Sequence, residues 1–401
     1  MKKTGKKKED NSPKTYDRME GSSPNGGMLT FYNDEEGLKR QRGVIWEILK
    51  QVGASITSVK EITNVSLPVT VFEPRSYLQR LCDGWWSAPI FLNKAAQTTD
   101  PVERLKLVVT FTIAGFHNTC GGYKPFNPIL GETFQAQFED GTEVFAEQSS
   151  HHPPVTTWQL IGPGGCYQYH GYGEWIASFR GNSAKGAQKG PNFIDFPDGT
   201  SIRFSLPELW VRGMVWGERV QEYCGVIEYR DEKNDLSCDV FINPKEGGFL
   251  SGWFSKKTPA DYFKGEIRRG ALEDDSSEDV KSGKKKRTES TVICTIEGSW
   301  VSCIEFDGER YWDFKQNLPK HVPKPVDDPL PSDSRFREDL CFLAAGDLQQ
   351  SGLAKTRLEE KQRYEARLRR EGAELRKKEP AKEPRVFRKA DLEQAFLPSD
   401  K

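Results

Sequence analysis

The sequence predicts a mainly β fold with flanking helices (α+β), organised around a large antiparallel β-barrel. Between residue 133 and about residue 316, apolar and polar side chains alternate with a period of two, which is typical of half-buried strands. Turn sequences rich in Gly, Pro, Asn and Asp interrupt this region at short intervals, and helical patterns precede and follow it. About ten or more antiparallel strands curl rather than stay in one flat sheet, so a barrel is expected.

The N-terminal residues 1–27 are rich in Lys, Ser, Gly and Pro and are expected to form a disordered basic tail. A solubilising tail is the simplest interpretation, and contact with anionic membranes is the alternative. One ordered domain is expected over residues 28–372. Its first helix is predicted over residues 37–52, where apolar side chains recur at spacings of three, four and seven. This apolar stripe, which usually faces a core, consists of Leu38, Ile45, Ile48, Leu49 and Val52.

Two further helices are expected before the strands. A short helix covers residues 77–81, and a longer one from about residue 100 to 118 is apolar nearly all round, which indicates burial. The first strand pattern follows, with Phe134 and Phe138 on its apolar face. Later in the chain, residues 273–290 combine acidic and basic runs and are interpreted as a solvated insertion loop.

A long charged helix is predicted from about residue 348 to 370. Lys355, Glu359 and Arg363 are spaced by four residues on this helix and therefore share one face. By themselves they indicate a solvated helix with ion pairs between successive turns. Residues 373–401 are rich in Lys, Glu and Pro and are expected to form a charged tail.

Composition excludes several classes of function. A net charge of −1 gives no field that would favour nucleic acid, and no apolar run reaches the about 18 residues that a membrane span needs. The basic N-terminus has no apolar segment after it, so no signal peptide is expected. Eight cysteines are scattered without CxxC spacing, which is typical of reduced thiols. A cytosolic protein is therefore predicted.

The segment from Glu147 to Pro154 reads Glu-Gln-Ser-Ser-His-His-Pro-Pro and holds two of the five histidines. The prolines restrict the backbone and supply no N–H, so they end the preceding strand and fix the histidines in position. An imidazole is a donor, an acceptor or, near neutral pH, a cation. The pair His151 and His152 therefore suits a phosphate or a metal ion, and a strand end with two solvated histidines is the simpler alternative.

Several motifs carry a resemblance to a known family. The run from Lys124 to Phe134, Lys-Pro-Phe-Asn-Pro-Ile-Leu-Gly-Glu-Thr-Phe, and the histidine motif together resemble the oxysterol-binding-protein-related family. The tract from Leu330 to Arg337 and the Lys-x-x-x-Glu-x-x-x-Arg pattern of the last helix are similar to motifs of the same family. Ser149 departs from the pattern, because family members usually have Val there, but both imidazoles and both prolines are present.

The resemblance implies an incomplete barrel that encloses a lipid tunnel, with C-terminal helices and an N-terminal lid at about residues 37–62. Ile45, Ile48 and Leu49 would belong to the lid. The ligands would be phosphatidylinositol 4-phosphate and a sterol, which share the tunnel and are exchanged between membranes. Glu132 would orient a neighbouring group. The headgroup-binding residues would be Lys124, Asn127, His151, His152, Lys355, Glu359 and Arg363.

These residue types fit the chemistry of that headgroup. An arginine beside a histidine pair suits one phosphate, lysines suit the other as point charges, and an amide and a carboxylate suit inositol hydroxyls. No cofactor is expected. The protein would act at the surface of the endoplasmic reticulum, Golgi or plasma membrane. Residues 29–36 weakly resemble the acidic tract with two aromatic residues that endoplasmic-reticulum adaptors recruit.

Two other functions compete with lipid transfer. A metal-dependent hydrolase would use His151 and His152 as ligands, but catalytic zinc normally takes three protein ligands, and the other histidines are isolated in the sequence. A lipid-sensing scaffold is the second alternative, because the motifs report lipid binding and not transfer. No Gly-x-Ser-x-Gly elbow is present, so a nucleophilic enzyme is not predicted.

Overall fold

The computed structural model describes residues 14–52, 66–243, 258–270 and 290–378. It consists of two compact units, residues 1–352, here called the body, and residues 353–401. In the described part of the chain, no helix is long and apolar enough to cross a membrane. The helices are α1 (Glu35–Val52), α2 (Tyr77–Leu81), α3 (Ala88–Gln97), α4 (Pro101–Gly115), α5 (Glu338–Ala344) and α6 (Leu348–Lys378).

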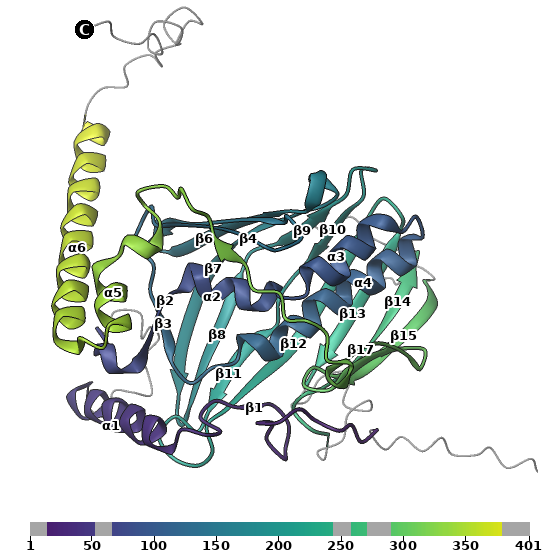
Figure 1. Ribbon diagram of the computed structural model, residues 1–401, viewed down its shortest axis with the longest axis horizontal. Helices are drawn as coiled ribbons and strands as arrows, with labels where there is room; N and C mark the ends of the chain where they lie inside the picture. The colour runs from purple at the N-terminus through teal and green to yellow at the C-terminus, as the bar shows by residue number, and fades with distance from the viewer. Residues whose placement is uncertain (1–13, 53–65, 244–257, 271–289, 379–401) are drawn as a thin grey trace, which may run out of the picture. The chain divides into compact units, whose positions relative to one another are not determined.

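One large antiparallel sheet dominates the body (Figure 1). Its strands pair in the order β17-β16-β15-β14-β13-β12-β10-β9-β7-β6-β5-β4-β18, with β1, β8 and β11 attached off this path. A separate parallel pair joins β2 to β3. The strands are β1 (Met28–Leu29), β2 (Phe72–Ser76), β3 (Lys124–Phe126), β4 (Thr133–Gln137), β5 (Glu143–His151), β6 (Pro154–Ile161), β7 (Gln168–Arg180), β8 (Ser183–Lys189), β9 (Asn192–Asp195), β10 (Ser201–Phe204), β11 (Glu208–Arg212), β12 (Val220–Asp231), β13 (Leu236–Ile242), β14 (Tyr262–Arg269), β15 (Thr291–Ser299), β16 (Cys303–Phe306), β17 (Glu309–Asp313) and β18 (Lys324–Pro325).

The sheet curves without closing. Its path ends at β17 and β18, which do not pair with each other in the described part of the chain. The two long strands β7 and β12 are joined by two routes, one through β8 and β11 and the other through β9 and β10. Because each long strand changes partners along its length, the sheet has to bend there. The incomplete antiparallel barrel with flanking helices is thus confirmed.

Helix α4 is the buried helix that the sequence predicts. Asp100 caps it by accepting the Val102 N–H, and Pro101 takes the first helical position, where no N–H is needed. Nearly every side chain after its first turn is buried. Figure 1 shows α3 and α4 beside each other against the sheet, and α4 packs on β16 and β17. Phe111 of α4 meets the Tyr169 ring of β7 edge-on, with centroids 5.7 Å apart.

Several strands show the predicted alternation, but others do not, and among these β8 and β11 stand out. β10 and β13 alternate strictly between buried and more exposed residues, as strands packed on one face do. In β8 and β11 nearly every residue is half-exposed on both faces. The inner face of the sheet is therefore incompletely covered at these two strands, whereas aromatic and aliphatic side chains fill it around α4.

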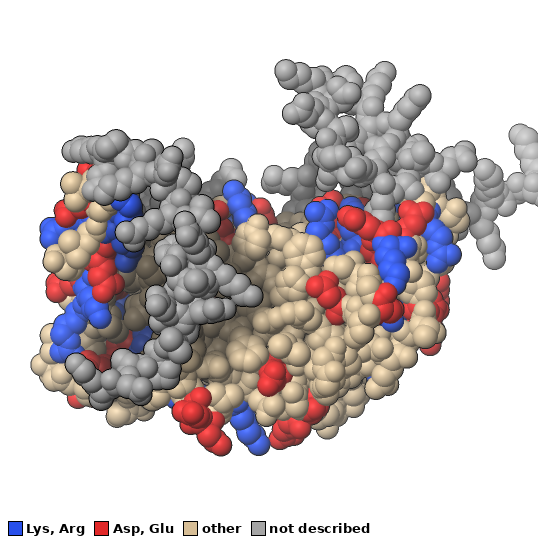
Figure 2. Space-filling view, turned by 90° about the horizontal axis from the view of Figure 1, so that it is seen from above, with Lys and Arg blue, Asp and Glu red and all other residues tan. Residues whose placement is uncertain are grey.

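Charged side chains on the face drawn in Figure 2 gather toward its margins, and uncharged side chains cover most of its middle. Basic and acidic side chains are interspersed there rather than separated into areas of one sign. This distribution agrees with the net charge of −1. It gives this face none of the continuous basic surface by which nucleic acids are bound.

The N-terminal tail ends earlier than the sequence predicts. Residues 14–27 were expected to be disordered, yet Tyr16 is buried and stacks on Tyr262, and Arg18 forms an ion pair with the buried Asp261 at 2.9 Å. An aromatic anchor and a buried charge pair compensate for the ordering of a polar segment, which composition alone does not reveal. The adaptor-like tract at residues 29–36 is packed only in part, because Phe31 is buried and α1 begins at Glu35, whereas Tyr32 is exposed.

Other predicted segments lie partly or wholly outside the described residues. The expected insertion loop at residues 273–290 falls there except for its last residue, and so do lid residues 53–62, residues 1–13 and residues 379–401. The first and last predicted helices are present as α1 and α6, and α6 continues to Lys378, several residues beyond the predicted end.

Candidate functional site

The histidine pair lies where strand β5 ends. His151 is the last residue of β5 and His152 begins the turn to β6, with a cis peptide bond before Pro153. The two imidazole centroids are 4.5 Å apart, with the rings tilted by 59°. Side chains of successive strand residues point to opposite faces, so leaving the strand at His151 is what lets the rings approach. His152 is exposed and His151 is half-exposed.

Ser149, the residue that departs from the family pattern, lies in an irregularity of the β5–β6 pairing. The register shifts between Gln148 and Ser150, as at a β-bulge, so one residue of β5 has no partner in β6. The Ser149 hydroxyl donates to the Val155 carbonyl at 3.3 Å across this irregularity. Serine therefore supplies a local hydrogen bond here, and the orientation of the histidines does not depend on a valine side chain.

Lys124 is the first residue of β3, and Asn127 begins the loop that leads from β3 to β4. The Lys124 ammonium donates to the Asn127 side-chain oxygen and to the Pro125 carbonyl, and it lies 5.1 Å from the centroid of the Phe72 ring. Both Lys124 and Asn127 are exposed. The neighbouring Phe126 is buried and stacks on Phe72. This apolar contact anchors the segment, which exposes the Lys124 ammonium and the Asn127 amide to solvent.

Backbone hydrogen bonds join the segment before β4 to strand β5, which ends in the histidine pair. Gly131 donates its N–H to the Gln148 carbonyl, and Gln148 donates back to the Glu132 carbonyl, both at 2.9 Å. From this point the chain runs back to Asn127 on one side and forward to His151 on the other. Lys124 and Asn127 thus lie a few residues before this junction in the chain, and His151 and His152 lie a few residues after it.

Glu132 is buried beneath this loop and holds it in place. Its carboxylate accepts from the Ile129 N–H at 2.9 Å, from the Ser76 hydroxyl, and from the guanidinium of Arg337 at 2.8 Å. Arg337 also donates to the Asn127 carbonyl at 2.8 Å. Burial raises the pKa of Glu132, an effect that the Arg337 charge and these hydrogen bonds oppose. In this geometry Glu132 orients the Asn127 loop instead of pointing into solvent.

Arg337 is a site residue that the sequence analysis does not assign. Its guanidinium binds Asp339 through two nitrogens, at 3.1 and 2.7 Å, in addition to Glu132. The two carboxylates raise the pKa of Arg337 against the opposing effect of burial. Arg337 is the last residue of the tract from Leu330 that resembles the family, so the sequence did mark it. Residue spacing alone does not show that this tract contacts the loop before β4.

The remaining predicted headgroup residues belong to the second unit. On α6, the Lys355 ammonium lies 2.6 Å from one Glu359 oxygen, and the Arg363 guanidinium lies 3.2 Å from the other. The three side chains therefore share one helix face, as their spacing predicts. The carboxylate of Glu359 separates the two cations, which reduces their mutual repulsion and orients both.

The expected lid residues lie on α1. Ile45 is half-buried, and the side chains of Ile48 and Leu49 are outside the part of the chain that the structure describes. Gln41 of the same helix is buried and donates to the Gly122 carbonyl at 2.8 Å, which ties α1 to the loop before β3. The hydrogen bond from Gln41 therefore fixes the N-terminal half of α1, the helix that carries the apolar stripe, to the rest of the domain.

The interior of the body contains polar atoms without partners. In the described part of the chain, the Tyr77 hydroxyl, the Trp175 indole N–H and the Gln188 amide nitrogen are buried and make no hydrogen bond. Trp175 and Gln188 are directly paired on β7 and β8, and the Tyr77 ring meets Trp175 edge-on at 5.1 Å. Buried donors normally find a partner, so three neighbouring ones indicate a place for a polar group that is not part of the chain.

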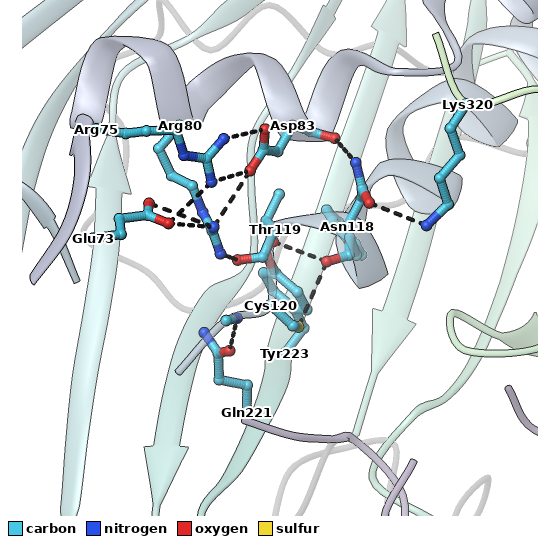
Figure 3. Close-up of polar contacts among 12 residues, drawn as sticks. Glu73, Arg75, Arg80, Asp83, Asn118, Thr119, Cys120, Gln221, Tyr223 and Lys320 are labelled. Atoms are coloured by element: carbon cyan, nitrogen blue, oxygen red, sulfur yellow. Dashed lines mark hydrogen bonds and ion pairs between the residues drawn. The ribbon is translucent and has the colours of Figure 1, made fainter. Parts of the chain in front are cut away.

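A charged cluster fixes the helix that carries Tyr77 (Figure 3). Arg75 of β2 binds Asp83 through two nitrogens, each at 2.9 Å, and reaches Glu73 at 3.1 Å. Arg80 of α2 pairs with Glu73 at 3.3 Å and donates to the Thr119 carbonyl at 2.9 Å. These contacts tie α2 to β2 and to the turn after α4, so they hold α2 at a fixed place against the sheet.

The structure gives the hydrolase alternative no support. Within the described ranges, no group of three or more His, Cys, Asp or Glu side chains is placed to hold a metal ion. His117 is enclosed by Trp86 and Trp312, and His170 binds Asp195 at 2.8 Å, so neither is a partner of His151.

Comparisons with known proteins agree with this fold. Residues 44–399 match the family model described as oxysterol-binding protein. Oxysterol-binding protein 9 of Dictyostelium discoideum is 41% identical over 348 residues, which cover 86% of this chain and 80% of that relative. Human oxysterol-binding protein-related protein 3 is 29% identical over 371 residues, which cover 86% of this chain but 37% of the human protein.

Two solved structures have the same fold. The Osh1 ORD domain in complex with cholesterol has a TM-score of 0.63 and 22% sequence identity, covering 82% of this chain and 80% of that one. The Osh3 ORD in complex with PI(4)P from Saccharomyces cerevisiae has a TM-score of 0.59 and 22% identity, covering 89% of each chain. The incomplete barrel and the helices packed against it are the fold of these ORD domains. The chain belongs to the oxysterol-binding protein family.

Proposed function

We propose that the protein is a non-enzymatic lipid-transfer protein that binds phosphatidylinositol 4-phosphate and a sterol in one interior chamber and exchanges them between membranes. The observation that carries the proposal is the under-covered inner face at β8 and β11, next to three buried polar atoms without partners. An apolar ligand with a single hydroxyl satisfies both features, because its body covers the strands and its hydroxyl meets Tyr77, Trp175 or Gln188.

The histidine pair at the end of β5 and the Lys124–Asn127 segment support binding of the phosphoinositide headgroup. They present two imidazoles, an ammonium and an amide, all donors that a phosphate and inositol hydroxyls need. Lys355, Glu359 and Arg363 complete the proposed headgroup set. Their assignment rests on the family's motif pattern, and a double-mutant cycle between His152→Ala and Lys355→Ala tests it. We expect the loss of phosphoinositide affinity in the double variant to differ from the sum of the two single losses. Strictly additive losses would mean that His152 and Lys355 do not bind the same headgroup.

Bound structures of two relatives also support a shared chamber. Cholesterol is the ligand of the Osh1 domain and PI(4)P that of the Osh3 domain, and both share the fold of this chain. Exchange between membranes follows if the two lipids exclude each other, since phosphoinositide taken up at one membrane then releases sterol there. We place this activity in the cytosol, at the surface of the endoplasmic reticulum, Golgi or plasma membrane.

Extraction and transfer from liposomes test the proposal. The protein is mixed with vesicles that carry phosphatidylinositol 4-phosphate and with vesicles that carry a fluorescent sterol, and both lipids are followed in the soluble and vesicle fractions. We expect each lipid to be extracted and each to displace the other. The double change His151→Ala with His152→Ala is expected to abolish phosphoinositide extraction and to leave sterol extraction intact.

Other outcomes of this experiment have a clear meaning. Equal loss of both ligands in a well-folded variant would contradict separate headgroup and interior sites. Extraction without net transfer between vesicles would favour a lipid-sensing scaffold. A tightly bound metal ion in a tag-free sample, lost in the histidine variant, would return the metal-dependent hydrolase to consideration.

A further inference from the structure

The turn between β11 and β12 presents a large aromatic side chain to solvent. Trp216, near the end of the turn Gly213–Gly217, is 65% exposed, although the turn around it is extensively hydrogen-bonded. Asn182, in the turn between β7 and β8, accepts from the Val215 and Trp216 N–H groups at 2.7 and 3.2 Å and donates to the Trp216 carbonyl at 2.8 Å. One side chain thus ties the two hairpin turns together at the Trp216 backbone.

Two arginines hold the same turn from the other side. Arg219, only 4% exposed, donates to the carbonyls of Gly213 and Met214 at 3.1 and 2.7 Å and to the Gln41 side chain at 3.0 Å. Arg42 of α1 donates to the Gly213 carbonyl at 3.4 Å and to the Gly217 carbonyl. Gly213 has a φ of +68°, and a side chain there would strike the Glu218 carbonyl, so the tight turn requires glycine.

The two guanidiniums are not neutralised within the described residues. The hydrogen bonds of Arg42 and Arg219 described above go to uncharged carbonyl and amide oxygens, and the Arg42 Nε is buried without a hydrogen-bond partner. Burial and the neighbouring Arg42 charge lower the pKa of Arg219 to about 10. The turn itself carries no carboxylate to offset these two positive charges, and the exposed Glu218 follows directly after it.

A second exposed tryptophan lies on the same face of α1 as Arg42. Trp46 follows Arg42 by four residues, so the two side chains are neighbours on the helix, and Trp46 is 52% exposed. The nearby Glu47 is paired with Lys50 at 2.8 Å. Figure 1 shows α1 and the lower ends of β8 and β11 at the same border of the sheet, and the Arg42 hydrogen bonds join them.

We infer that the turn Gly213–Gly217 and the adjoining face of α1 dock on the surface of an anionic lipid bilayer, with Trp216 and Trp46 inserted at the level of the headgroups. Tryptophan favours this interfacial depth, since its ring is apolar and its N–H still reaches water or headgroup oxygens. Uncompensated arginines beside the rings add attraction to acidic lipids. A turn held by Asn182, Arg42 and Arg219 loses little conformational freedom on docking, which favours binding.

A bilayer suits this surface better than a protein partner does. The two indoles are on separate elements and protrude beside cations, instead of lining an apolar groove that a partner side chain would fill. The biological role of this surface rests on the proposed lipid transfer. The test of the surface is independent of that proposal, because the vesicles used contain neither a phosphoinositide nor a sterol.

The test is sedimentation of the full chain with vesicles of pure phosphatidylcholine and with vesicles that also contain phosphatidylserine. We expect the wild-type protein to bind the second kind more tightly, and Trp216→Ser to lower the affinity at least about tenfold. Tyr172→Ser removes an aromatic side chain of β7 that is 49% exposed, and it serves as the matched control with unchanged binding. Arg42→Gln is expected to lower the preference for anionic vesicles about fivefold.

A second measurement reports insertion directly. Brominated phosphatidylcholine quenches tryptophan fluorescence on contact, so Trp216→Phe, which keeps an apolar ring, is expected to retain most vesicle binding and to lose part of the quenching. Unchanged sedimentation of Trp216→Ser, or wild-type protein that binds neither kind of vesicle, would overturn the docking surface. Binding of a water-soluble, short-chain phosphatidylinositol 4-phosphate is measured alongside. Its absence would refute the proposed headgroup site while vesicle docking through Trp216 still stands.

Discussion

Arg337 and Glu132 form an ion pair of 2.8 Å with almost no exposed surface on either side chain. The pair connects the segment after β18 with the loop that carries Asn127, two parts of the chain more than two hundred residues apart in sequence. Asp339 adds a second carboxylate to the same guanidinium. The position of the Asn127 loop therefore depends on a buried charge cluster that a distant segment completes.

We predict that Arg337→Met destabilises the protein by about 3–5 kcal/mol, because the buried Glu132 and Asp339 carboxylates lose their only basic partner among the described residues. Unfolding in urea, followed by circular dichroism, measures this loss. Arg203→Met, an exposed change on β10, is the control and is expected to cost less than about 0.5 kcal/mol. An Arg337→Met variant as stable as the control would mean that the pair has no structural role.

Sequence reasoning predicted the β region and the buried helix α4. These features depend on local patterns, such as the period of two in β10 and the all-round apolar surface of α4. It did not assign Arg337 to the site or place residues 14–27 against the body, because both depend on contacts between distant segments, such as Arg18 with Asp261. The half-exposed faces of β8 and β11 depend on the curvature of the whole sheet, which no local pattern encodes.

His117 is predicted to make stability fall in weakly acidic solution. Burial between Trp86 and Trp312 lowers the pKa of His117 to about 3, from an ordinary value of 6.5. Between these two values the unfolded chain binds a proton that the folded chain does not, so stability decreases as pH falls below about 6.5 and this contribution levels off below about 3. At pH 5 the loss from this residue is about 2 kcal/mol.

Urea unfolding at pH 7.5 and pH 5 measures this contribution of His117. His117→Gln has no titrating ring, so its own loss of stability over the same interval is expected to be smaller by about 2 kcal/mol, whatever the substitution costs at pH 7.5. Equal pH dependence in the two proteins would show that the imidazole becomes protonated in the folded state, and therefore that it is not isolated from solvent.

Gln188→Leu is predicted to weaken sterol binding while phosphoinositide extraction stays within about twofold of the wild-type value. The amide nitrogen of Gln188 is buried without a partner, and leucine removes this donor at similar volume. A ligand hydroxyl then loses a hydrogen bond, which costs about 1 kcal/mol or about fivefold in affinity. Gln159→Leu, a change of a partly exposed glutamine on β6, is the control. Unchanged sterol affinity in Gln188→Leu would place the sterol hydroxyl elsewhere.

Ile45→Asn is predicted to speed release of the sterol without slowing the first encounter with a vesicle. Ile45 is the half-buried member of the proposed lid stripe on α1, and α1 is fixed to the body through Gln41. If α1 covers the bound lipid, removing half of an isoleucine's apolar contact costs about 1 kcal/mol, which raises the dissociation rate about fivefold. Stopped-flow transfer of a fluorescent sterol to acceptor vesicles separates dissociation of the sterol from the first encounter with the vesicle.

Lys39→Asn, an exposed change on the same helix, is expected to leave the dissociation rate unchanged. Equal dissociation rates in the wild-type protein and Ile45→Asn would mean that α1 packs on the body without covering the ligand, and the lid would then have to be sought in another segment.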